Sequence, residues 1–435
     1  MDGTIFATAT ASGRAGVAIV RVSGANALDA VRLMTGIENP RPRQAVFTEI
    51  HALDGTPIDN ALVLYFPCPH SFTGEDVVEF QTHGGRAIAA AMLENLSKIK
   101  GFRPAQRGEF TRRAVENGKM DLTAAEGLAD LVDAETEQQR KQALRQMGGA
   151  LAKKYEDWHD RLKHLLAWME AYIDFPEEEI PDSVSDDVRG KITGLIDEIQ
   201  AHLDDGRRGE KLRDGFQIAI IGAPNAGKSS LMNRLAQRDV AIVSSTAGTT
   251  RDIIEVRLDI NGYPVVVADT AGLRDTDEEI EAEGVRRAKA RAAESDLVLW
   301  LTDATGAKNP AEAQGIDADK IVSVMNKADK TDAKNDGNIW ISAKTGQGVD
   351  ALIEKIAGLV DERMGLREEP SLTRLRHREA LRDCVADLRS ALNALEQELT
   401  AEDLRMAMRS LGKITGRVQV EELLDLIFKD FCIGK

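Results

Sequence analysis

One segment near the middle of the chain has the residue types and spacing of a phosphate-binding loop. Residues 222–229 read GAPNAGKS and lie between the apolar run Ile218–Ile221 and the helix-forming stretch Leu231–Leu235. In this order of strand, loop and helix, glycines let backbone N–H groups point at phosphate oxygens, and Lys228 adds a positive charge. The Ser229 hydroxyl is the expected Mg²⁺ ligand. The expected contacts to the nucleotide are Asn225, Ala226, Gly227, Lys228, Ser229 and Ser230.

Three later motifs indicate which nucleotide binds. An apolar run at 264–268 reads as a buried strand, and the motif after it lies at the strand's carboxyl end, where the metal and the γ-phosphate bind. A second run at 321–325 leads to NKAD, and WISAK at 340–344 supplies a loop along the base edge. The residues of these motifs are Asp269, Thr270, Ala271, Gly272, Asn326, Lys327, Ala328, Asp329, Ser342, Ala343 and Lys344.

The carboxylate of Asp329 can accept hydrogen bonds from both the ring N–H and the amine of guanine. Adenine lacks this pair of donors, so a site built around a buried carboxylate would reject it strongly. The four motifs, in this order, resemble those of the Ras-like GTPase superfamily, which implies a GTP-hydrolysing enzyme.

The residue after the Asp-Thr-Ala-Gly motif is Leu273, whereas Ras-type enzymes carry a glutamine there that orients the attacking water. Leucine cannot orient water, so another polar group must. The acidic stretch 275–283 offers candidates, and by resemblance the best is Glu281. Alternatively, Glu281 is one solvated acid among several at the start of a helix.

Asn225 and the segment 244–252, SSTAGTTRD, predict a monovalent cation site. A carboxamide oxygen and loop carbonyls near the phosphates form an all-oxygen set, which suits K⁺ where an arginine finger would otherwise lie. Thr250 is the expected second Mg²⁺ ligand. This resembles the cation-activated GTPases that dimerise through their G domains. The loop residues expected at the site are Ser244, Ser245, Thr246, Ala247, Gly248, Thr249 and Thr250.

Composition limits the possible partners and compartments. The 435 residues suffice for two to four domains, and the net charge of −16 opposes loose binding to a phosphate backbone. Any contact with RNA is therefore local or supplied by a partner. Cys68, Cys384 and Cys432 are widely spaced, which argues for reduced thiols. No apolar run reaches membrane-spanning length and no leader is evident, which predicts a cytoplasmic protein with no membrane contact.

The pattern of the chain predicts an insertion. Residues 214–360 alternate strands and helices, whereas 120–212 and 370–435 read as helical. One helical domain interrupted by a GTPase is the simplest model. Residues 1–117 contain short alternating runs that indicate an α+β domain, with polar and glycine residues concentrated at 71–85. Two apolar stripes are expected in the helical core: Trp158, Leu162, Leu165, Leu166, Met169 and Ile173, and Leu381, Cys384, Val385, Leu388, Leu392 and Leu395.

Several short segments together resemble the MnmE (TrmE) family of tRNA modification GTPases over essentially the whole chain. They are GRAG at 13–16, FTGED at 72–76, HGG at 83–85, RGEFT at 107–111, NGKMDL at 117–122 and FCIGK at 431–435. The resemblance implies a multidomain fold: an α+β folate-binding and dimerisation domain (1–117), a discontinuous all-α helical domain (118–213 and 366–435), and an inserted α/β GTPase domain (214–365).

The resemblance also implies the chemistry. The family adds an aminomethyl or carboxymethylaminomethyl group to carbon 5 of the wobble uridine of certain tRNAs. It takes the carbon unit from a tetrahydrofolate derivative, such as 5-formyl- or methylene-tetrahydrofolate. The family acts as a homodimer with the FAD-containing protein MnmG, in a heterotetrameric or larger complex.

Residues that match family positions carry implied roles. Arg21, Glu79, Lys119 and Lys435 stand where the family contacts folate. Asn225, Ser244, Thr246 and Thr249 match the K⁺ positions, and Ser229 and Thr250 match the Mg²⁺ positions. Cys432 lies in the terminal motif and is either a nucleophile or a structural thiol beside the folate pocket. No neighbouring base in the sequence would activate it.

A second class of function stays open, that of a regulatory GTPase of ribosome assembly. Such proteins share the four motifs and often lack the glutamine. They typically append an RNA-binding module or a second G domain, and this chain shows neither. The sequence does not indicate which uridine product dominates or which residues contact tRNA.

Overall fold

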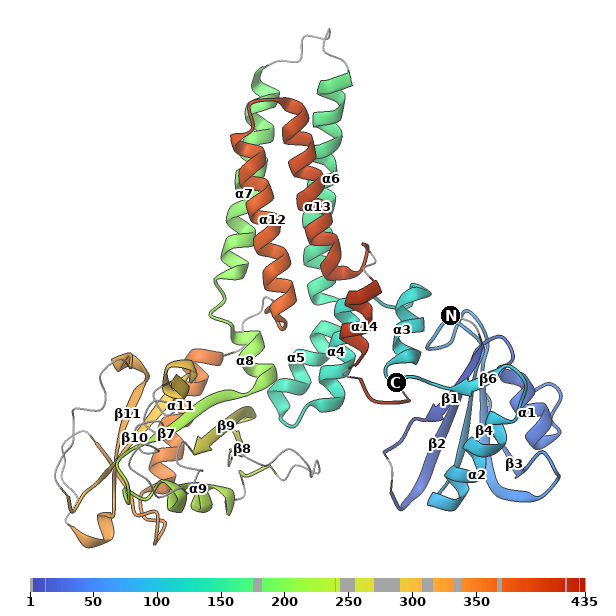
Figure 1. Ribbon diagram of the computed structural model, residues 1–435, viewed down its shortest axis with the longest axis horizontal. Helices are drawn as coiled ribbons and strands as arrows, with labels where there is room; N and C mark the ends of the chain where they lie inside the picture. Colours follow the sequence, from blue (N-terminus) through green and yellow to red (C-terminus); the bar gives the residue numbers. More distant parts are fainter. Residues whose placement is uncertain are drawn as a thin grey trace, which may run out of the picture. The chain divides into compact units, whose positions relative to one another are not determined.

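The computed structural model describes residues 3–11, 13–174, 182–238, 240–242, 255–269, 290–306, 316–331, 338–365, 370–418, 421–429 and 431–434 (Figure 1). The chain forms two compact units. The first contains Met1–Ala129, Met147–Lys163 and Met408–Lys435, and the second contains Asp130–Gln146 and His164–Ala407. Each unit therefore combines segments that are far apart in the sequence.

The first unit contains a six-stranded sheet with the order β3-β4-β5-β2-β1-β6. Only the β1–β6 pair is parallel. Alternate residues of a strand point to opposite faces, and Phe6 of β1 joins the core beneath α1 and α2, while Ile5 and Ala7 pack with Phe110 of α3. The elements are β1 (Thr4–Thr8), β2 (Ala15–Ser23), α1 (Ala27–Thr35), β3 (Val46–His51), β4 (Pro57–Phe66), β5 (Val77–Gly84), α2 (Arg86–Ser97), β6 (Phe102–Pro104) and α3 (Glu109–Glu116).

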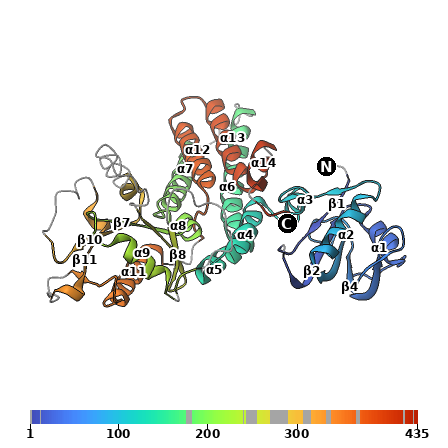
Figure 2. The same ribbon diagram turned by 60° about the horizontal axis from the view of Figure 1, so that its bottom comes forward.

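Helices fill the segments on either side of the GTPase motifs, as predicted. The elements are α4 (Leu122–Asp133), α5 (Glu137–Met147), α6 (Ala150–Asp174), α7 (Asp182–Leu203), α8 (Arg208–Asp214), α12 (Leu375–Asn393), α13 (Gln397–Thr415) and α14 (Glu421–Lys429). Helices α7 and α12 lie side by side, as Figures 1 and 2 show. Ion pairs from Arg405 to Glu170 and from Arg417 to Glu156 join α13 to α6.

The two predicted apolar stripes are largely confirmed. Most of their members are buried, including Trp158 and Cys384, and Leu166, Ile173 and Leu392 are half-buried. The prediction for Leu395 was wrong, because this side chain is 100% exposed. Helix α12 ends at Asn393, so the 3.6-residue period no longer applies two residues later.

The GTPase motifs lie on a second six-stranded sheet with the order β12-β11-β10-β7-β9-β8, in which only β8 is antiparallel to its neighbour. This is the Ras-like α/β fold that the motifs predicted. The elements are β7 (Phe216–Ile221), α9 (Lys228–Ala236), β8 (Glu255–Ile260), β9 (Tyr263–Asp269), β10 (Leu297–Asp303), β11 (Ile321–Asn326), β12 (Ile339–Trp340) and α11 (Val349–Met364), with short 3₁₀ turns at Ala318–Lys320 and Ala328–Lys330.

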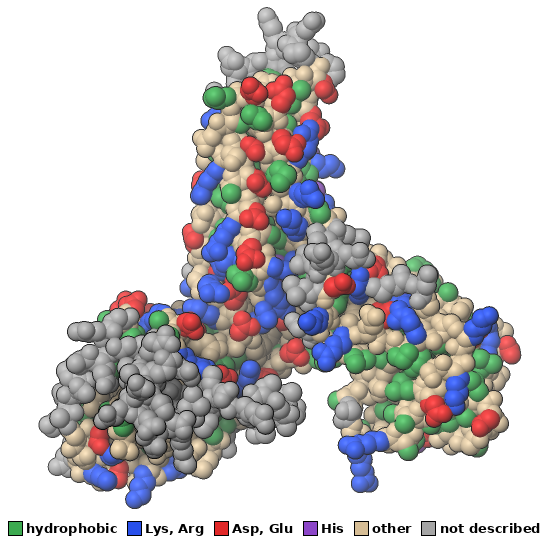
Figure 3. All heavy atoms as spheres, viewed as in Figure 1, with side chains coloured by type: hydrophobic (Ala, Val, Ile, Leu, Met, Phe, Trp, Pro, Cys, Tyr) green, Lys and Arg blue, Asp and Glu red, His purple; other side chains and the backbone are tan. Residues whose placement is uncertain are grey.

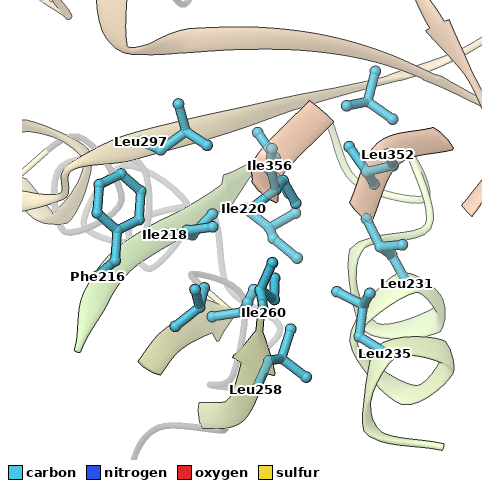
Figure 4. Packing of buried hydrophobic residues seen from close by; sticks show 14 of the residues in the cluster. Phe216, Ile218, Ile220, Leu231, Leu235, Leu258, Ile260, Leu297, Leu352 and Ile356 are labelled. Atoms are coloured by element: carbon cyan, nitrogen blue, oxygen red, sulfur yellow. The ribbon is translucent and has the colours of Figure 1, made fainter. Parts of the chain in front are cut away.

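The core of this sheet fixes where its loops lie. Ile218 and Ile220 of β7 are buried with Leu231 of α9 and Ile356 of α11 (Figure 4). Because β7, β9, β10 and β11 run parallel, their carboxyl ends meet at one edge of the sheet, where ligands of such folds bind. Across the described residues, no helix has the length and apolar character needed to cross a membrane.

Candidate nucleotide site and N-terminal polar site

The phosphate-binding loop joins β7 to α9 and depends on backbone conformations that few residues adopt. Gly227 has a φ of +100°, and an added Cβ would lie 2.1 Å from Asn326 Nδ2. Asn225 also has a positive φ, of +64°. Lys228 Nζ donates to the carbonyl oxygens of Gly222 (2.7 Å) and Ala223 (3.2 Å). The ammonium group therefore lies over the loop, where a phosphate group would meet it.

Asn326 joins three of the four predicted motifs. Its side chain is 3% exposed, donates to Ala226 O at 2.7 Å, and accepts from the Ala343 N–H at 3.0 Å. One buried carboxamide thus holds the phosphate-binding loop and the base-edge loop in a fixed relation. The structure brings these separate sequence motifs together at the carboxyl edge of the sheet.

Asp329 follows β11 and accepts a hydrogen bond from Ser342 Oγ at 2.6 Å. This hydrogen bond is the main cause of an Asp329 pKa below its ordinary value, so the group is an ionised acceptor near neutral pH. The sequence-based picture of a buried carboxylate was wrong in one respect, because Asp329 is exposed. The side chain lies at the surface, where its remaining lone pairs are open to a base.

Two residues outside the four motifs also shape this site, and the sequence analysis missed both. Arg234 of α9 donates to Ala343 O at 3.2 Å and to Lys344 O. Asp303, at the end of β10, forms an ion pair with Lys327 and accepts hydrogen bonds from the N–H and the hydroxyl of Thr305. Burial opposes ionisation of Asp303, but Lys327 and Thr305 outweigh it and lower its pKa to about 2. Its place at a strand end, like that of Asn326, was the signal that could have found it.

Part of the predicted nucleotide site lies outside the described residues. For Asp269 only the backbone is described, at the end of β9 opposite Ile220. The predicted residues outside the described ranges are Ser244, Ser245, Thr246, Ala247, Gly248, Thr249, Thr250, Thr270, Ala271, Gly272, Glu281 and Lys435.

In the first unit, Arg21 and Glu79 face each other across β2 and β5. Arg21 Nε donates to Glu79 Oε1 at 2.9 Å, and the two side chains are 20% and 16% exposed. The guanidinium lies over two rings, with its Cζ 5.5 Å from the centroid of Phe72 and 5.7 Å from that of Phe110. Phe110 is 0% exposed and Phe72 is half-buried, so a ligand could meet the Phe72 ring together with the partly exposed Arg21 and Glu79 side chains. This combination suits a flat ligand that carries negative charge.

Lys119 contacts the loop between β4 and β5 that also carries Phe72. Its Nζ donates to Pro69 O at 2.9 Å, three residues before Phe72 in the same loop. Glu75 in that loop accepts from Arg113 at 3.0 Å and from Ser23 Oγ at 2.7 Å. Charged side chains therefore hold the loop before β5 in place, and the rest of the polar segment 71–85 is mostly strand β5.

A buried ion network supports the loop, and the sequence analysis missed it. Glu109 is almost fully buried and accepts from Arg103 (2.8 Å), Arg113 (3.0 Å) and the Gln106 N–H (2.8 Å). Burial alone would raise the Glu109 pKa, but these donors outweigh burial and lower it below 4.5. The network reaches the loop through Arg113 and Glu75, which are 38 positions apart, so no local pattern reveals that contact.

The last described residues of the chain pack against the N-terminal domain. Ile433 forms an isolated antiparallel β-bridge with Arg107, and the Gly108 N–H donates to Cys432 O at 3.3 Å. Gly108 has a φ of +65°, and an added Cβ would lie 2.9 Å from Phe431 Cβ. An added Cβ at Gly434 would lie 2.2 Å from Thr8 O, next to Ala7, which pairs with Arg21. Gly434 thus lies against the end of β1, which pairs with the strand that carries Arg21, and Cys432 itself is exposed.

Two family models cover most of the chain. One described as "MnmE helical domain" matches residues 122–432, and one described as "GTP-binding protein TrmE N-terminus" matches residues 4–119. The tRNA modification GTPase MnmE of Parvibaculum lavamentivorans is 55% identical and covers 99% of this chain and 100% of that protein. The chain belongs to the MnmE family of tRNA modification GTPases. The MnmE protein of Rhodospirillum rubrum is 52% identical over 99% of both chains.

Membership in the MnmE family makes the chain a GTP hydrolase and agrees with the fold described above. Among solved structures, a variant of Aquifex aeolicus Era bound to GDP and AlF₄⁻ is similar, with 25% identity and a TM-score of 0.27 over 41% of this chain and 68% of that one. The two family models and the two relatives confirm the MnmE resemblance in the sequence.

Proposed function

We propose that the chain is a K⁺-activated GTPase which, with the FAD protein MnmG, modifies carbon 5 of the wobble uridine of tRNA. The observation that carries this proposal is the pairing of two sites in a member of the MnmE family. One is the guanine-nucleotide site joined by Asn326, and the other is the Arg21 site in the N-terminal domain. We also propose that the chain acts in the cytoplasm, with domains at 1–117, 118–213 with 366–435, and 214–365.

The nucleotide site offers the groups that GTP hydrolysis needs. Lys228 and the loop N–H groups would hold the phosphates, and Ser229 and Thr250 would hold Mg²⁺. Asn225, with its carboxamide on a loop residue of positive φ, would supply an oxygen ligand to K⁺ together with Ser244, Thr246 and Thr249. The bound cations would stabilise negative charge that develops during phosphoryl transfer. Glu281 would orient the attacking water.

The Arg21 site fits a tetrahydrofolate derivative. A pterin is flat and carries hydrogen-bond donors, which suits the half-buried Phe72 ring and the Glu79 carboxylate. The glutamate tail of a folate is anionic, which suits Lys119, Arg21 and the terminal Lys435. We assign Cys432 a structural role, because its carbonyl accepts from the Gly108 N–H and ties the tail to the domain.

A homodimer through the N-terminal domain is supported by one open sheet face. Phe47 pairs with Leu62 across β3 and β4, so both side chains point to the same face. They are 71% and 38% exposed, and Val17 of β2 is 54% exposed. Leu62 in turn pairs with Gln81, and Gln81 with Ile19, so Ile19 of β2 lies on the same face as Phe47 and Leu62. A second copy would cover this face.

Charge argues that the partner supplies most of the tRNA contact. The chain carries a net charge of −16, and Figure 3 shows acidic and basic side chains interspersed along the helices on the face in view. A phosphate backbone binds best to a surface of one sign. This arrangement favours a complex with MnmG over independent RNA binding. No observation on the described residues favours ribosome assembly.

The decisive experiment reconstitutes the reaction. We expect the purified chain, the partner, GTP, Mg²⁺, K⁺, methylene-tetrahydrofolate and an amine source, ammonium or glycine, to convert the wobble uridine of a substrate tRNA. The folate supplies the methylene carbon and the amine source the nitrogen, and mass spectrometry of the nucleosides detects the product. Arg21→Ala should abolish conversion and folate binding by calorimetry, while GTP turnover continues. Arg32→Ala on α1, an exposed arginine paired with Asp29, is the matched control. Full conversion by Arg21→Ala would contradict the folate assignment.

A second measurement tests dimeric coupling. Spin labels on the two G domains of a dimer should approach each other when GDP, AlF₄⁻ and K⁺ replace GDP alone, because facing G domains can order each other's cation loops. A distance distribution that stays the same in both states would contradict coupling through G-domain contact.

A further inference from the structure

Within the second unit, the chain enters and leaves the GTPase domain through two segments that lie side by side. Helix α8 leads into β7, and residues 370–374 lead out of α11 towards α12. An added Cβ at Gly209 would lie only 2.3 Å from Leu372 O, and an Arg213 guanidinium nitrogen donates to Thr373 O at 3.3 Å. A domain joined to its neighbour only by two adjacent segments can rotate about them as about a hinge.

Helix α5 binds both of these segments through one row of glutamines. Gln139 Nε2 donates to Arg213 O at 3.0 Å, and Gln142 Nε2 donates to Gly209 O at 3.1 Å. Gln146 Oε1 accepts from Thr373 Oγ1 at 2.9 Å in a buried contact. Residues three and four apart share one face of a helix, so the row is a continuous edge of α5.

The first turn of the same helix contacts a different part of the GTPase domain, the hairpin that joins β8 to β9. The Gln138 N–H donates to Gly262 O at 3.0 Å, and Glu135, just before α5, pairs with Arg257 of β8 at 3.4 Å. Asn261 and Gly262 have φ values of +53° and +83°, which make the turn tight. In the sequence, this hairpin connects the predicted cation loop, 244–250, to the Asp269 motif.

We propose that α5 is a second attachment of the GTPase domain, and that Gln138, Gln139 and Gln142 are positioning residues that set this domain's orientation against the helical domain. With the hinge alone the domain could turn freely. With the hairpin held as well, its orientation is defined, and a displacement of the hairpin must move α5 and the segments bound to its glutamine row. Coupling between nucleotide and helices would then run through the hairpin, in addition to the chain connections.

One feature of the contact suits an attachment that opens and closes. The buried Oε1 of Gln138 has no hydrogen-bond partner among the described residues, and the Glu135–Arg257 pair is partly exposed. An unpartnered buried acceptor destabilises the docked state, and an exposed ion pair adds little to it. The docked and undocked states would therefore be close in free energy, as a switch requires.

The test measures the orientation of the domain directly. Spin labels are placed at Glu354→Cys on α11 and Ser390→Cys on α12 in a full chain with Cys68→Ser and Cys432→Ser, diluted into unlabelled chain. Gln138→Pro with Arg257→Gln removes the N–H donor and the ion pair, and proline is tolerated in a first helical turn. Gln138→Ala keeps the N–H and is its control. We expect the distance distribution to broaden about twofold in the proline variant and to keep its width in the alanine variant.

A second pair of variants tests the glutamine row independently. Gln142→Glu places a carboxylate against Gly209 O, and Lys141→Gln makes the same change of charge on the outer side of α5. We expect broadening only in Gln142→Glu. The proposal would be overturned by a distance distribution of unchanged width in Gln142→Glu, or in a folded variant with Gln138→Pro and Arg257→Gln.

A third measurement changes the bound nucleotide, and it rests on the proposed GTPase function. In the otherwise native labelled chain, replacing GDP by GDP, AlF₄⁻ and K⁺ should shift the mean distance, and the shift should be lost in the proline variant. Affinity for GDP, measured on the same samples, should change by less than about twofold, because α5 binds the hairpin and the two connecting segments. If the native chain failed to bind GDP, the proposed GTPase function itself would be contradicted. If the proline variant bound GDP normally and still showed the full nucleotide-dependent shift in mean distance, the proposal that α5 couples the hairpin to the helices would be contradicted.

Discussion

The nucleotide site and the Arg21 site are built in opposite ways. At the nucleotide site each of the four motifs follows a strand, and a parallel sheet brings the four strand ends to one edge. At the Arg21 site the pair Arg21 and Glu79 is joined by Phe72, Phe110 and Lys119, which come from loops and helices. Single substitutions in one motif should therefore impair the nucleotide site, whereas the Arg21 site should also be sensitive to substitutions at residues that do not line it.

The largest effect should come from the base-reading carboxylate. Asp329→Asn replaces one acceptor oxygen by a donor, so GTP affinity should fall by about a thousandfold and preference should move towards xanthine nucleotides. Competition between GTP and XTP measures it. Asp350→Asn, an exposed carboxylate on α11, is the control. Unchanged GTP preference would mean that Asp329 does not read the base.

The N-terminal site should be most sensitive at a residue that does not line it. Glu109→Gln leaves Arg103 and Arg113 without their buried partner and should lower the free energy of unfolding by about 3 kcal/mol. Chemical denaturation measures it, with Glu116→Gln, the exposed partner of Arg112, as control. Equal stability of the two variants would contradict a supporting role for the network.

The same network predicts a dependence on pH. The folded-state pKa of Glu109 lies below its unfolded value of 4.5, so its contribution is complete above that value. It is lost as the pH falls through the lowered folded pKa. Between pH 6 and the acid limit, the native chain should therefore lose more stability than Glu109→Gln does. Parallel losses in both proteins would exclude Glu109 as the cause.

Cation dependence probes the part of the nucleotide site that lacks a water-orienting glutamine. GTP turnover should be about tenfold faster in K⁺ than in Na⁺, because a bound K⁺ would supply part of the positive charge that an arginine finger supplies in other GTPases. Asn225→Ala should remove the K⁺ response and leave GDP binding largely intact. Steady-state phosphate release in the two salts measures this, and equal rates in the native chain would exclude cation activation.

A milder change at the Arg21 site separates charge from shape. Arg21→Lys keeps the charge but loses the planar group between Phe72 and Phe110, so affinity for 5-formyl-tetrahydrofolate should fall about tenfold. Calorimetry measures the affinity, and Arg32→Lys serves as control. An affinity equal to that of the native chain would show that stacking contributes nothing.

The smallest effect should follow from Arg234→Ala, which frees the carbonyls of Ala343 and Lys344. Loss of about 1 kcal/mol from the base-edge loop corresponds to GDP dissociation about fivefold faster. Stopped-flow release of a fluorescent GDP measures the rate. Arg238→Ala, whose partner is the exposed Asp350, should leave it unchanged.

Sequence reasoning succeeded where function depends on local backbone chemistry. The strand, loop and helix around Gly227, the strand before Asp329 and the apolar stripes through Trp158 and Cys384 all follow from short-range patterns. It failed at Leu395, where the end of a helix was misplaced, and at Arg234 and Asp303, whose importance comes from contacts with other strands and loops. The Arg21 site needed a family resemblance before it could be named at all.

The sequence alone determined the nucleotide class, the family and the three kinds of fold, because glycine positions, strand-end carboxylates and hydrophobic periods act over a few residues. The tertiary structure alone decided which distant groups meet. It placed the Asn326 carboxamide between two loops, closed the ion network on Glu109, seated the C-terminal tail against Gly108, and laid α5 along both the hairpin and the two connecting segments. Apart from the ion network on Glu109, whose donors lie within six residues of Glu109, these contacts join residues tens to hundreds of positions apart. Only the packing of the whole chain brings such distant pairs within hydrogen-bonding distance.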